Sequence, residues 1–389
     1  MYRPTVWFMA LAAALGTASI YPLQPAIADV AGTLDISVAH AGVALACGPV
    51  GYLLGLAVLV PLVDRFRPKH VLAAQFCVLA IALVGNAAAS TPWLLGLAVG
   101  VIGAGSTVGA QLSSVAARFA DTRRRATELG IVTAGISAGI IGGRVLGGWL
   151  TDVFGWRETL LVFALACLVV ALIALRVLPA APGTVTTSYL ATLRGLPGLI
   201  VESPMLRLAA SRGALWFFAF CAVWSGLAVA LSQPPFSYSP EQIGLFAIAG
   251  LLGIVATRVA GAWTDRVGAR SVILVGLAVA AVAAAALGVF LSSTVATLVC
   301  LALFDAGLFA AQVANQSTVL AIDPAAPARF NSAYMVVYFI GGTAGTAFGA
   351  VAVGWFGWPA TAAVIALAIV FAIALTAANR PSELLDSPR

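Results

Sequence analysis

Three ionisable side chains lie inside long apolar runs of the sequence, where a charge is costly. Asp305 follows about eleven residues of the apolar run 294–321, and Arg144 and Arg258 lie within two other runs. If these runs cross a membrane, Asp305 lies about 16 Å deep, near the middle of an apolar layer about 30 Å thick. A charge there costs about 2.5–3.5 kcal/mol on insertion scales, so each group needs a partner. We predict a charge pair between Asp305 and one of the arginines, which a proton or a substrate anion replaces in another conformation.

Polar and aromatic side chains recur at helical spacing around these charges. Phe309, Gln312 and Gln316 follow Asp305 at four, seven and eleven residues, which places all of them on one helix face. We predict that such stripes line a mostly apolar site with a few polar groups, as suits a small amphiphilic molecule. The predicted substrate-binding residues are Tyr21, Gln24, Gln111, Trp216, Phe220, Trp224, Gln312, Asn315, Gln316, Tyr334 and Tyr338.

Each of these residues also has a structural interpretation. Asp305 could cap or donate to a neighbouring helix, Arg144 and Arg258 could extend to helix carbonyls or to the membrane surface, and aromatic stripes often serve packing alone. No Walker loop, HExxH sequence or nucleophile elbow occurs, and His40 and His70 stand apart near loop edges. We therefore expect no enzyme activity, no cofactor and no metal site.

The composition excludes an ordinary soluble protein. Of the 389 residues, 62% are hydrophobic and 9% are charged, whereas a soluble domain carries about 25% charged residues. Lipid must therefore cover most of the surface. The five cysteines lie in apolar runs without CxxC spacing, which argues against disulfides and against a metal site. The net charge of +6 would suggest a nucleic-acid partner for a soluble protein, but its distribution here indicates membrane topology, and we expect no such partner.

Turn-rich and charged segments divide the chain into twelve apolar runs. Each run approaches or exceeds the length of about 20 residues that crosses a bilayer. We predict an all-α, polytopic membrane protein with twelve transmembrane helices. The predicted spans are residues 5–29, 41–63, 71–89, 93–117, 127–150, 158–178, 208–231, 242–264, 271–291, 294–321, 332–355 and 359–378. The first resembles a signal peptide, but its length and its place in the series identify it as a span.

Basic residues alternate from loop to loop. Of the 20 lysines and arginines, Arg157 is assigned to an outward loop, and Arg144 and Arg258 lie within spans. The remaining 17, with Arg207 and Arg212 among them, fall in segments that are cytoplasmic if the N-terminus is cytoplasmic. Because cytoplasmic loops carry the excess of positive charge, we expect both termini to be cytoplasmic. We expect the membrane to be the inner membrane of a bacterium.

Two landmarks repeat at nearly the same offset. The Asp-Arg pair at 64–65 recurs at 265–266, and Phe-Gly-Trp at 154–156 recurs at 356–358. Such a duplication predicts two six-helix halves with the substrate site near mid-membrane between them. The linker between the halves is expected either to lie on the membrane surface or to be unstructured. The predicted parts are an N-terminal half at 1–180, a cytoplasmic linker at 181–206 and a C-terminal half at 207–389.

These motifs resemble the major facilitator superfamily, and within it the bacterial drug and metabolite exporters of the arabinose-efflux type. A loop signature runs from Gly261 to Arg270 and is degraded in the first half, and an antiporter-type glycine pattern lies in span 127–150, with Arg144 where the pattern has proline. The resemblance implies the major facilitator fold, a latch at the inner gate and a fifth span that slides against the eighth. The gating residues that it implies are Asp64, Arg65, Gly261, Asp265, Arg266, Gly268, Arg270, Gly139, Gly143, Gly147 and Gly148.

The pattern as a whole predicts a secondary active transporter, because the sequence holds no nucleotide-binding motif. The leading hypothesis is efflux of a small amphiphilic metabolite or drug by a proton antiporter that works by alternating access, with Asp305, Arg144 and Arg258 in proton coupling. A facilitator or importer without obligatory proton coupling is the alternative. The expected partners are a small-molecule substrate, the lipid bilayer and protons, and we expect a monomer.

Overall fold

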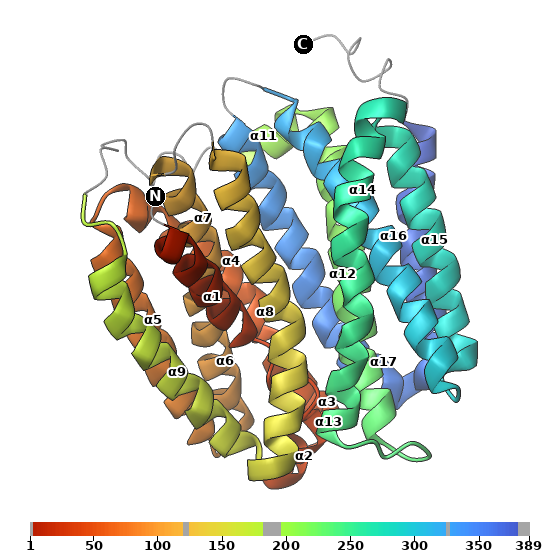
Figure 1. The fold of residues 1–389 in the computed structure, drawn as a ribbon. Helices are drawn as coiled ribbons and strands as arrows, with labels where there is room; N and C mark the ends of the chain where they lie inside the picture. The colour runs from red at the N-terminus through yellow and green to blue at the C-terminus, as the bar shows by residue number, and fades with distance from the viewer. Residues whose placement is uncertain (1–2, 120–123, 182–195, 324–326, 380–389) are drawn as a thin grey trace. The chain divides into compact units, whose positions relative to one another are not determined.

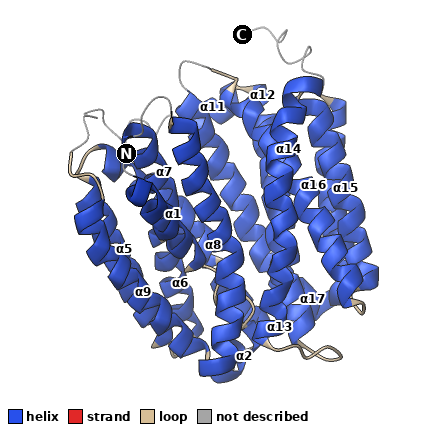
Figure 2. Cartoon of the chain, viewed as in Figure 1, coloured by secondary structure: helices blue, strands red, loops and turns tan. Residues whose placement is uncertain are grey.

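The computed structural model describes residues 3–119, 124–181, 196–323 and 327–379. Within these residues every regular element is a helix, and no strand occurs (Figure 1 and Figure 2). The helices pack into two units, of which the first holds the described part of residues 1–187 together with Leu231–Ala247, and the second holds the rest. The predicted all-α fold is confirmed.

The first unit contains the helices of the predicted N-terminal half and one short helix from further along the chain. Within it α1 packs on α8, α4 on α6, and α5 on α9, as Figure 1 shows for the last pair. Its elements are α1 (Arg3–Ala18), α2 (Ile27–Thr33), α3 (Val38–Leu45), α4 (Cys47–Val58), the 3-10 helix η1 (Val60–Asp64), α5 (Pro68–Ala87), α6 (Pro92–Gly105), α7 (Val108–Phe119), α8 (Arg125–Phe154), α9 (Trp156–Val177) and α13 (Pro240–Leu245).

The second unit is built around three long helices that pack closely, α15, α16 and α17. A 3-10 helix, η2 (Phe246–Gly250), joins the two units along the chain. The long α17 is interrupted at Gly357, whose φ of 75° is incompatible with a continuous helix. The elements of the second unit are α11 (Leu196–Glu202), α12 (Pro204–Ser232), α14 (Leu251–Val267), α15 (Ala269–Phe290), α16 (Thr294–Leu320) and α17 (Pro327–Ala378).

Helix boundaries follow local sequence signals. Before α6 the hydroxyl of Thr91 accepts a hydrogen bond from the backbone N–H of Leu94 at 3.4 Å, and Pro92 occupies the first turn. Before α13 the side chain of Ser239 accepts from the N–H of Gln242, whose own side chain accepts from the N–H of Ser239. Both are N-terminal caps that satisfy donors which a helix leaves unpaired.

The helix lengths agree with the twelve predicted spans. Ten described helical stretches are long and apolar enough to cross a membrane. The last of them, Arg329–Ala378, holds two spans that meet at Gly357. The sixteen residues of α1 and the turns after it correspond to the first predicted span. Large apolar side chains such as Trp93, which is 87% exposed, cover the outside of the helices, as a lipid-facing surface requires.

A ladder of glycines lets α8 approach α1 backbone to backbone. A Cβ atom built on Gly143 would lie 2.5 Å from the carbonyl oxygen of Ala18, and the Cβ positions of Gly139 and Gly147 also meet the α1 chain or the turn that follows it. No L-side chain fits at such distances. The ladder therefore requires glycine at every fourth residue of α8.

The same ladder occurs in the second unit. Gly341, Gly345 and Gly349 of α17 face the backbone of α12, and a Cβ atom on Gly345 would lie 2.7 Å from Cα of Phe218. These glycines follow those of α8 at an offset of 202, the offset of the Phe-Gly-Trp landmark. The internal repeat therefore extends to the packing of one helix pair in each unit.

The resemblance implied that these glycines serve the contact between the fifth and eighth spans, and most of them do not. The three of the ladder face the first span, because the spacing shows that a helix comes close but not which helix. Gly148 alone meets the eighth span, since its Cβ position lies 2.9 Å from the carbonyl carbon of Pro240 in α13. Close packing on this opposite face brings Leu231–Ala247 into the first unit.

Candidate substrate-binding and coupling site

Arg144 lies in a polar cluster with two of the predicted substrate-binding residues. The side chain is 4% exposed, and its Nε donates a hydrogen bond of 2.6 Å to Oε1 of Gln24. The guanidinium carbon lies 4.4 Å from the centre of the Tyr21 ring, a cation–π geometry. The α8 helix supplies Arg144, and the turns that follow α1 supply its two partners. The structure thus joins three residues that the sequence pattern named separately.

Gln111, which is predicted to bind substrate, uses its amide nitrogen for a contact within the protein. Its Nε2 donates to the carbonyl oxygen of Leu59 at 2.6 Å, which ties α7 to the end of α4. Its Oε1 is buried without a hydrogen-bond partner among the described residues. A buried acceptor without a partner has a desolvation cost. This oxygen therefore remains a candidate to accept a hydrogen bond from a donor group of the substrate.

An aromatic cluster in the second unit contains three of the predicted residues. Trp216 stacks on Phe220 at 5.6 Å and on Tyr338 at 5.5 Å between ring centres, and it meets Phe309 edge to face at 5.5 Å. Its indole N–H donates to the backbone carbonyl of Leu308. Three helices, α12, α16 and α17, supply these rings. Trp224 extends the cluster through Phe220, at 6.4 Å.

A polar cluster lies next to the rings on the same three helices. Tyr334, which is fully buried, donates to Oε1 of Gln312 at 2.9 Å, and Asn315 Nδ2 donates to the carbonyl of Ala209 at 2.9 Å and to the Tyr334 hydroxyl at 3.5 Å. Gln316 instead donates to Oδ1 of Asn331 at 3.1 Å. Three predicted substrate-binding residues, Gln312, Asn315 and Tyr334, are thus linked to one another, and Gln316 bonds outside this group.

The charge count places Arg212 on the cytoplasmic side, yet the residue falls within the predicted span 208–231, and the structure shows it buried there. It lies inside α12, only 8% exposed, one residue before Gly213, where a Cβ atom would meet the Tyr334 hydroxyl at 2.5 Å. A count of basic residues assigns each one to a side of the membrane and does not show whether a residue near the end of a span is buried. The signal that could have found it is the spacing to Trp216, four residues on, which places both on one helix face.

Asp305 is 1% exposed and lies in the middle of α16. It faces α14, because a Cβ atom on Gly253 would lie 3.3 Å from the Asp305 Cβ, and it precedes Phe309 of the aromatic cluster by one helical turn. Arg258 lies further along α14 with an exposed side chain. Arg144 belongs to the first unit. Pairing of Asp305 with either arginine stays a prediction.

The loop signature holds together the ends of the second unit. Gly268 has a φ of 84° between α14 and α15, a conformation that favours glycine. Arg270 donates from Nε to the carbonyl of Thr376 at 3.3 Å and from Nη2 to that of Ala377 at 3.0 Å, at the end of α17. Asp265 and Arg266 are exposed. The basic residue of the signature therefore caps the last helix.

In the first unit a different arginine holds the corresponding region. Arg118 of α7 donates to the carbonyl of Val63 at 3.0 Å and to that of Ala181 at 2.7 Å. The backbone N–H of Lys69 donates to the carbonyl of Pro179 at 3.4 Å, and Asp64 and Arg65 lie beside these contacts at the end of η1. Each unit thus joins its signature loop to the end of its sixth span. A latching role for these loops stays a prediction.

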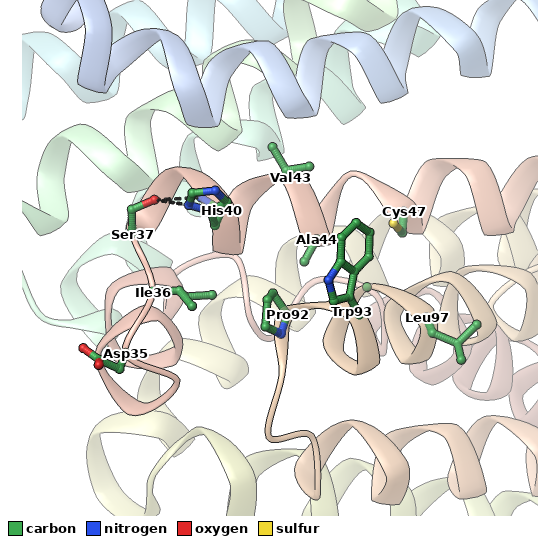
Figure 3. Close-up of a pocket in the computed structure, with 11 residues that line it drawn as sticks. Asp35, Ile36, Ser37, His40, Val43, Ala44, Cys47, Pro92, Trp93 and Leu97 are labelled. Carbon is green, nitrogen blue, oxygen red and sulfur yellow. Dashed lines mark hydrogen bonds between the residues drawn. The ribbon is translucent and has the colours of Figure 1, made fainter.

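Two cavities within the first unit lie apart from the predicted site. The larger, of about 790 Å³, lies between α3 and α6 beside the exposed Trp93, and Figure 3 shows the Ser37–His40 hydrogen bond of 2.6 Å at one end of it. The smaller, of about 460 Å³, lies between the beginnings of α1 and α8. No predicted substrate-binding residue lines either cavity.

Comparison with known proteins gives the family. The model of the Major Facilitator Superfamily matches residues 6–233 and, a second time, 213–388. The Streptomyces coelicolor protein named "Probable transporter SCO4007" is 34% identical over 381 residues, which cover 96% of this chain and 87% of that protein. The Escherichia coli transporter YgaY is 30% identical over 365 residues, 92% of each chain.

A solved structure shows the same fold. The bacterial homologue of the human lysosomal transporter Spinster, in an inward-facing and occupied conformation, superposes with a TM-score of 0.79 at 15% identity, over 97% of each chain. At that identity the likeness concerns the fold alone. Together with the family match over both halves, it leads to one conclusion: the chain belongs to the Major Facilitator Superfamily of transporters.

Proposed function

We propose that the protein exports a small amphiphilic solute in exchange for protons. Membership of a transporter family supports transport, and a single structural observation supports the coupling. Asp305, 1% exposed, lies one helical turn from the aromatic cluster formed by Trp216, Phe220, Phe309 and Tyr338. A carboxyl group that can take up a proton therefore lies beside a surface that can hold an apolar solute.

Alternating access would couple the two. An ionised carboxylate is costly in an apolar helix bundle unless a positive charge or hydrogen bonds compensate it. If one conformation brings an arginine or water to Asp305 and the other removes it, the carboxyl group releases a proton in the first and takes one up in the second. The solute occupies the aromatic surface while the carboxyl group changes its charge.

We place the protein in a bacterial inner membrane with both termini cytoplasmic. The support is the distribution of lysine and arginine along the chain. In this orientation Leu231–Ala247 lies at the outer side and the two signature loops lie at the inner side. The resemblance to exporters of the arabinose-efflux type supports the outward direction.

The experiment that tests coupling is Asp305→Asn in proteoliposomes with an imposed pH gradient. The substitution keeps size and hydrogen bonding but removes ionisation, so we expect accumulation against a solute gradient to disappear while exchange of solute persists. Asp35→Asn is the matched control, because Asp35 is exposed and its φ of 52° suits asparagine equally well. Continued pH-driven accumulation by the Asp305 variant would favour a facilitator or importer without proton coupling.

A further inference from the structure

Arg212 is a buried cation without a partner in the described part of the chain. It lies inside α12, 8% exposed, and its Nε atom is fully buried with no hydrogen-bond acceptor. It makes no ion pair or hydrogen bond with any described residue. A buried guanidinium without compensation is strongly unfavourable, so a group outside the described protein atoms is expected to satisfy it.

The helices around Arg212 offer no acidic side chain to neutralise it. Neither α12 nor α17 contains an aspartate or glutamate. The one acid of α16, Asp305, lies ten residues from Asn315, which is about 15 Å along the helix. Two neutral polar groups meet this part of α12, because the Tyr334 hydroxyl faces Gly213 and the Asn315 amide donates to the carbonyl of Ala209. These three helices therefore supply no carboxylate to this part of the second unit.

Asn315 carries a second unsatisfied group. Its Nδ2 donates to Ala209, three residues before Arg212 on α12, whereas its Oδ1 is buried without a partner. A buried donor of α12 and a buried acceptor of α16 are thus both unpaired among the described residues. A ligand that presents an anionic oxygen and a hydroxyl or amide donor would satisfy both.

The aromatic cluster continues from these polar groups along two helices. Trp216 follows Arg212 by four residues on α12, and Tyr338 follows Tyr334 by four residues on α17. The rings of Tyr334 and Tyr338 lie 5.7 Å apart, and that of Tyr338 stacks on Trp216 at 5.5 Å. Since i and i+4 share a helix face, the charge lies at one end of an aromatic surface. An elongated ligand with an acidic end and an apolar body matches this order.

We propose that Arg212 binds the acidic group of the transported solute, which is therefore an organic anion with an aromatic or similarly apolar body. This inference rests on the proposed transport of a small amphiphilic solute and names its chemical class. The planar guanidinium pairs with a carboxylate through two parallel hydrogen bonds, which a lysine cannot reproduce. Asn315 Oδ1 accepts from a hydroxyl or amide group of the same solute.

Equilibrium binding of simple aromatic acids tests the inference without any pH gradient. Benzoate and 2-naphthoate are titrated, each beside its uncharged amide, into the full chain in phosphatidylcholine nanodiscs, by calorimetry and by thermal shift. We expect the acids to bind and to raise the melting temperature, and the amides to bind at least about tenfold more weakly. Equal binding of acid and amide, or no binding of either acid at millimolar concentration, overturns the proposal.

Variants locate the site. Arg212→Gln is expected to lose at least about tenfold in affinity for benzoate, with Arg212→Lys between it and the wild type. Arg207→Gln is the matched control, because Arg207 is an exposed arginine one and a half turns earlier on α12, and it should bind as the wild type does. If Arg212→Gln does not fold, Arg212→Lys decides, and undiminished binding by it contradicts the proposal.

Two further measurements distinguish a transported anion from a lipid headgroup, and the anion site from proton coupling. Addition of phosphatidylglycerol to the nanodiscs should leave benzoate binding unchanged, and displacement of benzoate by this lipid would assign the arginine to a headgroup instead. If the wild type binds benzoate through Arg212 but Asp305→Asn keeps pH-driven accumulation, the coupling hypothesis fails while the anion site stands. If coupling is shown but Arg212→Gln binds benzoate as the wild type does, the anion site fails alone.

Discussion

The Nε atom of Arg144 donates a hydrogen bond of 2.6 Å to Oε1 of Gln24, a residue 120 positions earlier in the sequence. The same guanidinium lies over the ring of Tyr21. Arg144 therefore ties α8 to the turns after α1, at the level where the glycine ladder brings these two helices together. The guanidinium of Arg144 is therefore held in place by the turns that follow α1.

Arg144→Ala is expected to reduce transport by at least about tenfold while the amount of protein in the membrane stays within about twofold of wild type. The reason is that the substitution frees Gln24 and Tyr21 in the predicted site, whereas the glycine ladder still holds the helices. Transport of a radiolabelled solute, normalised to protein in the membrane, is the measurement. Loss of the folded peak in mild detergent, with normal behaviour of Arg144→Lys, would show that the residue is a structural tether.

The glycine ladder predicts a contrast between adjacent positions. Gly143→Ala places a Cβ atom 2.5 Å from the Ala18 carbonyl oxygen, whereas nothing lies within 4 Å of a Cβ atom on Gly142. We expect Gly143→Ala to destabilise the protein by about 1–3 kcal/mol, as overpacking commonly does, and Gly142→Ala to be neutral or slightly stabilising. Melting followed by fluorescence-detected size exclusion compares the two. Similar melting temperatures would mean that α1 yields to the added methyl group.

Arg270 should stabilise the end of α17. Arg270→Ala removes two hydrogen bonds to the carbonyls of Thr376 and Ala377, and a cation at a helix C-terminus is also favoured by the helix dipole. The expected loss of stability is about 1–2 kcal/mol. Arg266→Ala, which removes an exposed arginine of the same loop, is the control and should change little. Limited proteolysis near residue 376 reports fraying, and equal resistance of both variants would remove the capping role.

The orientation in the membrane can be tested by labelling single cysteines in a cysteine-free background. Ser237→Cys lies at an exposed position of the predicted outer segment, and Thr127→Cys lies at an exposed position near the predicted inner end of α8. An impermeant maleimide added to intact cells should label the first and not the second. Labelling in the opposite pattern would invert the predicted topology and place Leu231–Ala247 on the cytoplasmic side.

The features that could be predicted from the sequence are those that local pattern determines. Apolar length predicted the spans, and the Asp-Arg and Phe-Gly-Trp pairs predicted the repeat, which the glycines at 139 and 341 now extend to helix packing. What could not be predicted is the choice of partner, because spacing along one helix does not name the helix opposite. The ladder of α8 therefore faces an unexpected neighbour, and a count of charges does not indicate that Arg212 is buried next to Gly213, whose Cβ position meets Tyr334.

Residues 231–247 pack on a helix that is made much earlier. Oδ2 of Asp152 accepts a hydrogen bond of 2.5 Å from the Ser239 hydroxyl and one of 3.2 Å from the backbone N–H of Glu241, and 87 positions separate Asp152 from Ser239. At the usual rate of synthesis this interval takes about 4–17 seconds. During that time the nascent first unit exposes Asp152 and the face of Gly148 that Pro240 later covers. A truncated chain that stops before residue 231 therefore lacks a piece of its own first unit, and the end of α8 around Asp152 stays uncovered.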